Sequence, residues 1–192
     1  MTGTIGSISR DELSPRLQEA WDFVHALTGQ AGFIEKGAHA PELIDFTMVD
    51  FYEKIFFGGR VDNKLKQLAR LRMSLGHGCR SCNLGNSIGA KEAGYTETEL
   101  NAIEGDRSIF TEQERAVLDL ADQFLMTNVQ GHLDPTLYER LRTWFDDAQI
   151  LELGTVMSYL GGLAKMLFVF DMAEKEESCI FRPAPPEAVA AE

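Results

Sequence analysis

Apolar side chains recur every three or four residues along most of this chain, a spacing that fits helices and little else. In the stretch that Asp62 opens, for example, Leu65, Leu68, Leu71 and Leu75 form one apolar stripe along a helix. No segment shows a convincing alternation of apolar and polar residues, which is the pattern of a half-buried strand. The sequence therefore predicts an all-α fold.

Helix boundaries follow from capping residues, prolines and glycines. Ser14-Pro15, an N-cap and a first-turn proline, begins one helix; His39-Ala40-Pro41 begins a second, which Gly58-Gly59 ends. Two capping boxes, in which each side chain binds the other's backbone N–H, start two more helices at Thr96 and Thr111. Helices are predicted over residues 15–28, 41–57, 62–76, 79–93 and 147–170. Three further helices are predicted to begin at residues 96, 111 and 135.

Length and composition indicate one domain with a short tail. A chain of 192 residues with 44% apolar side chains can bury one substantial core, which we place in residues 1–182. The proline- and alanine-rich residues 183–192 are predicted to be a disordered tail. Residues 67–76 and 152–161 align without gaps, which suggests a pseudo-two-fold internal repeat. The alternative is that any two amphipathic helices would align this well.

The charge pattern excludes some partners. Thirty acidic against eighteen basic residues give a net charge of −12, and no basic stripe follows a phosphate backbone, so nucleic acid is not expected as a partner. The N-terminus has neither a signal-peptide nor a transit-peptide pattern, which predicts a cytoplasmic protein. Residues 148–170 are long and apolar enough to cross a membrane, but Glu152 and Lys165 within them favour a core or interface helix.

The segment GHGCRSCNLGN, residues 76–86, carries the clearest chemical signal. Cys79 and Cys82 are three residues apart, so they share one face of the helix that begins there and lie within disulfide reach. A helix N-terminus favours thiolate over thiol, and Arg80 adds a nearby cation. The pair meets the general requirements of reversible dithiol–disulfide chemistry.

Other interpretations of the cysteine pair are a metal site, a cofactor site or two core cysteines without chemistry. A zinc site of His77, Cys79, Cys82 and Cys179 lacks a second paired half, so no metal is expected. A c-type haem needs histidine where Asn83 stands, and a thioredoxin-like site needs a βαβ frame, so no cofactor is expected either. Two core cysteines without chemistry stay as the simplest alternative.

On these residues, the chain resembles the carboxymuconolactone decarboxylase and alkylhydroperoxidase D (AhpD-like) superfamily. The similarity runs from HAPELIDF through the cysteine segment and FTEQERAVLDLADQF to AQILELGTVMSYLGG. It implies an AhpD-like helical fold and a homo-oligomer, a trimer or hexamer. It also implies recycling by a dithiol partner that bears a lipoyl group.

The resemblance assigns roles to the two cysteines and exposes a departure from the pattern. Cys82 corresponds to the peroxidatic thiolate and Cys79 to the resolving thiol. The family's glutamate, twelve residues before the first cysteine, is Gln67 here, and its histidine, four after the second, is Asn86. Neither amide can take a proton from a thiol near neutral pH, so His77 is the candidate substitute base. The alternative is that His77 is only part of the glycine-flanked break between two helices.

Two buried-looking carboxylates have structural explanations. Glu114 is part of the capping box with Thr111. Glu152 interrupts an apolar helix, and a buried carboxylate needs a partner, for which Arg70 or Arg72 is expected.

Three functions follow as hypotheses. The first is a thiol-dependent oxidoreductase that reduces a hydroperoxide or another electrophile through Cys82 and Cys79. The second is a decarboxylase-like or lactone-handling enzyme in which Gln67 and Asn86 bind a carboxylate or carbonyl. The third is a non-catalytic oligomeric module that senses oxidation or binds a partner.

Overall fold

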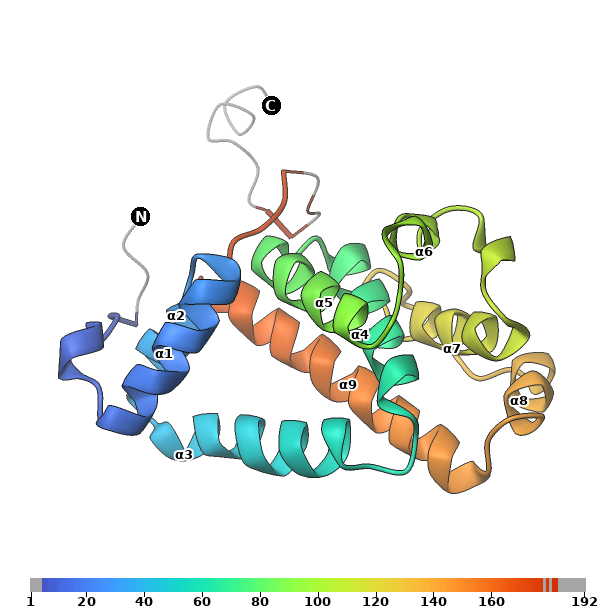
Figure 1. Ribbon diagram of the computed structural model, residues 1–192, viewed down its shortest axis with the longest axis horizontal. Helices are drawn as coiled ribbons and strands as arrows, with labels where there is room; N and C mark the ends of the chain where they lie inside the picture. Colours follow the sequence, from blue (N-terminus) through green and yellow to red (C-terminus); the bar gives the residue numbers. More distant parts are fainter. Residues whose placement is uncertain (1–4, 178, 180, 183–192) are drawn as a thin grey trace.

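The computed structural model describes residues 5–177, 179 and 181–182, and within them every regular element is helical (Figure 1). The predicted tail, 183–192, lies outside the described residues. The elements are η1 (Arg10–Glu12), α1 (Pro15–Thr28), α2 (Gly32–Gly37), α3 (Pro41–Asp45), η2 (Phe46–Phe57), α4 (Asn63–His77), α5 (Arg80–Glu92), α6 (Glu97–Ala102), η3 (Arg107–Ile109), α7 (Glu112–Gln123), α8 (Pro135–Arg142) and α9 (Asp147–Val169). The all-α prediction is confirmed.

Helix α9 is the axis of the molecule. It runs diagonally through the middle, with α4 and α5 on one side, η2 on the other, and α7 and α8 near its start (Figure 1). Leu153 and Met157 of α9 pack with residues of α4, α7 and α8, while Val156 and Leu160 pack with the aromatic residues of η2. This helix is long and apolar enough to pass a test for a membrane span, but its packing is that of a core helix.

Most predicted boundaries are observed. The capping boxes of Thr96 with Glu99 and of Thr111 with Glu114 are both formed. The predicted helix 41–57 is continuous, although from Phe46 onward its turns widen into the π-helix η2. The short helix α2 was not predicted, because six residues between two loops show no clear period.

Helices α4 and α9, which contain the two similar sequence segments, pack against each other in one cluster of buried residues. The pseudo-two-fold repeat and the single-domain assignment of residues 1–182 stay predictions.

A buried ion pair joins the loop after η2 to α9. The Glu152 carboxylate accepts hydrogen bonds from the backbone N–H groups of Arg60 (2.7 Å) and Val61 (3.0 Å) and from Lys66 Nζ (3.2 Å). The expected partner, Arg70 or Arg72, was therefore wrong. Lys66 lies on the face of α4 that meets α9, and Gly59 brings the loop so close to Glu152 that a Cβ atom would collide with the carboxylate.

Replacing Lys66 with methionine is expected to lower the free energy of unfolding by about 3 kcal/mol, because the substitution removes the buried cation of Glu152 and leaves only the exposed Arg60 guanidinium, 3.8 Å away. Lys54→Met, which breaks the exposed pair with Asp50, is the matched control and should change stability by about 0.5 kcal/mol or less. Urea titration of both variants measures the difference. Equal effects of the two substitutions would contradict a stabilising role for the buried pair.

Candidate active site

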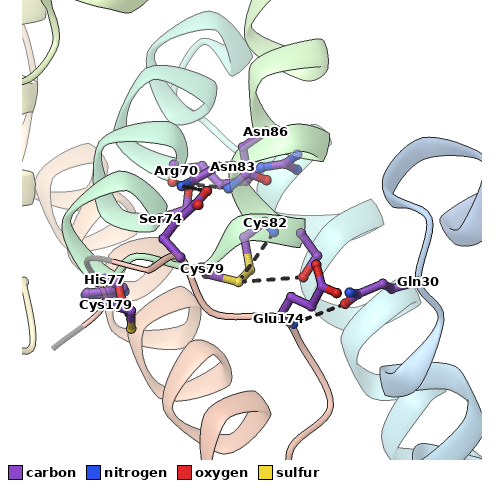
Figure 2. The surroundings of a disulfide bond; sticks show 12 residues. Gln30, Arg70, Ser74, His77, Cys79, Cys82, Asn83, Asn86, Glu174 and Cys179 are labelled. Carbon is purple, nitrogen blue, oxygen red and sulfur yellow. Dashed lines mark hydrogen bonds between the residues drawn. A yellow bond between two sulfur atoms is a disulfide. The ribbon is translucent and has the colours of Figure 1, made fainter. Parts of the chain in front are cut away.

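The N-terminus of α5 places both cysteines. Helix α4 ends at Gly78, whose φ of +67° and close contact with Cys179 leave no space for a side chain. The chain then turns directly into α5, with Cys79 as its N-cap and Cys82 in the first turn. The two sulfurs form a disulfide (Figure 2). The Cys82 backbone N–H also points to the Cys79 sulfur, at 3.4 Å.

The two cysteines differ in exposure. Cys79 is fully buried, at 0% exposure, and packs with Phe168 and Cys179. Cys82 is half-buried and lines a cavity of about 600 Å³, whereas Cys79 is not among the lining residues. An electrophile that enters the cavity therefore reaches the Cys82 sulfur first. This order agrees with the roles that the resemblance assigns to the two cysteines.

The cavity is mostly apolar and has the size of a small-molecule site. Its walls come from α1, the loop to α2, η2, α4, α5 and α9. Apolar lining residues include Phe23, Leu27, Tyr52, Met73, Leu163 and Leu167. More than half of its polar lining residues, among them Gln67, Arg70 and Asn86, lie on α4 and α5, the helix that also carries Cys82.

Both relay positions lie in this cavity. Gln67 of α4 and Asn86 of α5 line it together with Cys82. The Gln67 amide donates to Asn63 at 3.4 Å, and the Asn86 amide donates to the Arg70 backbone carbonyl, also at 3.4 Å. Gln67 Oε1 is buried and accepts no hydrogen bond within the described structure. Two neutral amides thus line the cavity at the positions where the resemblance places a proton relay, and neither amide transfers a proton near neutral pH.

His77 borders the same cavity, but its ring is engaged elsewhere. The Met126 backbone N–H donates to Nε2 at 3.2 Å, so the neutral ring carries its proton on Nδ1. Burial, helped by the nearby Arg72 charge, lowers the pKa of His77 to about 4. In Figure 2 the ring lies beside Cys179, apart from the disulfide. This geometry leaves no free acceptor nitrogen for a thiol proton and does not favour His77 as the substitute base, which remains a prediction.

The lowered pKa of His77 predicts a pH effect on stability. The unfolded chain binds a proton near the ordinary histidine pKa of about 6.5, whereas the folded protein binds it only near 4. The free energy of unfolding should therefore fall as pH is lowered through this window. His77→Gln should flatten that part of the stability curve, as measured by urea titration at several pH values. An unchanged slope would contradict a buried, neutral His77.

The segment after α9 covers the cysteine turn from outside the cavity. The backbone N–H of Arg80 donates to Glu174 at 3.0 Å, and that of Glu176 donates to Gly78 at 2.9 Å. The Cys179 thiol donates to the His77 carbonyl at 3.1 Å. In the part of the chain that the structure describes, no three His, Cys, Asp or Glu side chains converge as metal ligands. The zinc set of His77, Cys79, Cys82 and Cys179 is therefore not assembled there.

One residue of the cavity was not singled out from the sequence as a site residue. Arg70 follows Gln67 by three positions, so both lie on the face of α4 that borders the cavity. The signal was present in the spacing, but Arg70 was considered only as a partner for Glu152.

Comparison with known proteins gives a family and several similar folds. Residues 41–123 match the Carboxymuconolactone decarboxylase family. No curated protein matches the chain significantly.

Three solved structures illustrate the fold, each less than 25% identical to this chain. A cysteine-to-alanine variant of the debrominase Bmp8 in complex with 2,3,4-tribromopyrrole is 19% identical, with a TM-score of 0.69 over 92% of this chain and 94% of the other. An uncharacterized peroxidase-related protein with an alkylhydroperoxidase AhpD core, from Ralstonia eutropha JMP134, is 13% identical, with a TM-score of 0.69 over the same shares. A protein of unknown function from Agrobacterium tumefaciens, named as a candidate antioxidant defence protein AhpD, is 23% identical, with a TM-score of 0.62 over 70% and 92%. The AhpD-like fold expected from the sequence is confirmed.

Proposed function

Because residues 41–123 match the Carboxymuconolactone decarboxylase family and the fold is AhpD-like, we propose that the chain is a thiol-dependent oxidoreductase that reduces organic hydroperoxides. The observation that carries the proposal is the Cys79–Cys82 pair, with Cys82 lining an apolar cavity and Cys79 buried behind it. A substrate in the cavity meets one sulfur, and the second sulfur is already within bonding distance of the first.

The reaction begins with the reduced pair. The Cys82 thiolate attacks the terminal oxygen of the hydroperoxide, so an S–O bond forms as the O–O bond breaks, and the alkoxide takes a proton and leaves as the alcohol. The Cys79 sulfur then attacks the Cys82 sulfur, and the hydroxyl leaves with the Cys79 proton as water. In total, the dithiol loses two electrons and the hydroperoxide becomes alcohol and water. An external dithiol regenerates the pair by exchange and becomes a disulfide itself.

The first turn of α5 supports the thiolate. Cys82 lies where unpaired backbone N–H groups and the helix dipole favour negative charge. The neutral Gln67 and Asn86 can orient a bound peroxide by hydrogen bonding, but they do not transfer protons. Protons for the alkoxide therefore come from solvent or from the external dithiol, which predicts slow turnover.

Consumption of cumene hydroperoxide with a dithiol donor tests the proposal. Turnover above the rate of the donor alone supports it, and a preference for this bulky peroxide over hydrogen peroxide is expected from the apolar cavity. Absence of turnover with every dithiol, including dihydrolipoamide, would count against it. The lactone-handling hypothesis predicts conversion of a lactone or carboxylic acid without oxidation of thiols, and the sensing hypothesis predicts oxidation of the thiols without turnover.

A second candidate is reductive debromination of an aromatic ring. The similarity in fold to Bmp8 and the apolar wall beside Cys82 favour it. The balance is a dithiol and a carbon–bromine bond giving a disulfide, a carbon–hydrogen bond, bromide and a proton. Release of bromide from 2,3,4-tribromopyrrole in the presence of a dithiol, without hydroperoxide consumption, would replace the first candidate with this one.

A further inference from the structure

The two arginines of α4, Arg70 and Arg72, differ in whether a carboxylate pairs with them. Arg72, two residues later, binds Asp122 at 2.6 Å and Glu104 at 3.4 Å. Arg70 has no carboxylate within 4.0 Å among the described residues, and it lines the cavity that contains Cys82. Arg70 is only partly exposed, and a cation there without a counterion favours the binding of an anion that enters the cavity.

Aromatic rings hold the Arg70 guanidinium in place. Its central carbon lies 5.8 Å from the ring centre of Tyr52 and 5.2 Å from that of Phe56. Such cation–π contacts fix the position of the charge, but they satisfy none of its N–H donors in the plane of the group. Nε is buried, and no acceptor among the described residues takes its hydrogen. The Arg70 guanidinium is therefore held in position while its N–H donors remain available to a ligand.

Other donors lie on the same wall. Gln67 and Asn86 each use one amide hydrogen in a long hydrogen bond of 3.4 Å, and an amide nitrogen carries two. The cavity also has two acidic lining residues, Glu53 and Glu92, but both are exposed to solvent and neither pairs with Arg70 in the described structure. The polar side of the cavity thus presents a planar cation and two amides, which matches a carboxylate.

We propose that Arg70 binds the carboxylate of the substrate, so that the cavity takes an organic acid whose apolar body lies against α1, η2 and α9. The identity of the reacting group as a hydroperoxide rests on the proposed function, but the binding of the acid does not. The substrate class is then the hydroperoxide of an apolar acid. The carboxylate lies at Arg70, and the peroxide lies at Cys82.

Calorimetric titration of the oxidised protein tests the proposal without thiol chemistry. The probes are naphthoate and its uncharged amide, which have the same shape. Naphthoate is expected to bind about tenfold to a hundredfold more tightly than the amide, because charge-assisted hydrogen bonds to a fixed arginine discriminate by about that factor. Arg70→Gln should remove the preference. Arg16→Gln, a matched loss of charge at an exposed ion pair on α1, should keep it.

Several results would overturn the proposal. These are equal affinity of the wild-type protein for the two probes, no binding of either, or a preference that survives Arg70→Gln. The wild-type comparison needs no variant, so it decides the matter even if Arg70→Gln does not fold. If naphthoate binds through Arg70 but no hydroperoxide is consumed, the proposed function fails while the binding of an acid stands.

Discussion

Replacing Cys82 with serine is expected to reduce hydroperoxide consumption to the uncatalysed background, because Cys82 is the cysteine that lines the cavity. Cys79→Ser should behave differently. Its Cys82 can still attack the peroxide, but the sulfenic acid has no partner with which to form a disulfide. That variant should consume about one equivalent of peroxide quickly and then turn over only as fast as the external dithiol reaches Cys82 through the cavity.

Cys179→Ser is the control for both variants. Cys179 is buried and donates from its sulfur to the His77 carbonyl, a bond that a serine hydroxyl can replace. Its activity should match the wild-type protein in a coupled peroxide assay. If Cys82→Ser keeps wild-type turnover, or if Cys179→Ser loses activity as fully as Cys82→Ser does, the assignment of Cys82 as the attacking thiol is wrong.

The second large expected effect is an increase in the rate of hydroperoxide turnover. Combining Gln67→Glu with Asn86→His restores a carboxylate and an imidazole at two positions that line the cavity with Cys82. General acid–base assistance is worth about a hundredfold to ten-thousandfold, so peroxide turnover should rise within that range. The rate should also acquire a dependence on pH near the ordinary histidine pKa of about 6.5, an ionisation that the amide of Asn86 cannot supply.

A matched control separates a relay from a mere change of charge. Asn83 follows Cys82 directly, but its side chain donates to Glu176 at 3.4 Å and does not line the cavity. Gln67→Glu with Asn83→His therefore adds the same groups with the imidazole outside the cavity, and should show little gain. Thermal melting of each variant checks that the new buried carboxylate is tolerated. Equal rates in the wild type and the Gln67→Glu, Asn86→His protein would contradict the relay geometry.

Much of the fold was readable from local signals. Proline, the capping residues and the glycines predicted the boundaries of α1, α4, α5, α8 and α9, because these signals act within a few residues of one another. The short α2 was missed because its stability comes from packing, through the buried Ile34, rather than from its own pattern. The widened turns of η2 were not predicted either, since the apolar spacing of the segment fits an ordinary helix.

The site was predicted less completely than the fold. The cysteines and the two amides could be located, since their spacing along two adjoining helices is a sequence property. The partner of Glu152 was assigned incorrectly, because Lys66 and the backbone of Arg60 and Val61 approach it only through the packing of α4 and the η2 loop on α9. The isolation of Arg70 from any carboxylate likewise depends on where distant helices place their charges.

Homo-oligomer formation, recycling by a lipoyl-bearing dithiol and a cytoplasmic location stay predictions. Dihydrolipoamide as a donor in the peroxide assay tests the second of these directly.

The central claim is that Cys82 is oxidised first and Cys79 resolves it. The most direct measurement is thiol mass spectrometry after less than one equivalent of cumene hydroperoxide, with alkylation of the remaining thiols after denaturation. The wild-type protein should yield a Cys79–Cys82 disulfide with Cys179 alkylated, and Cys79→Ser should carry one added oxygen on Cys82. Equal oxidation of all three cysteines, or oxygen on Cys79 in Cys82→Ser at the same rate, would contradict the account.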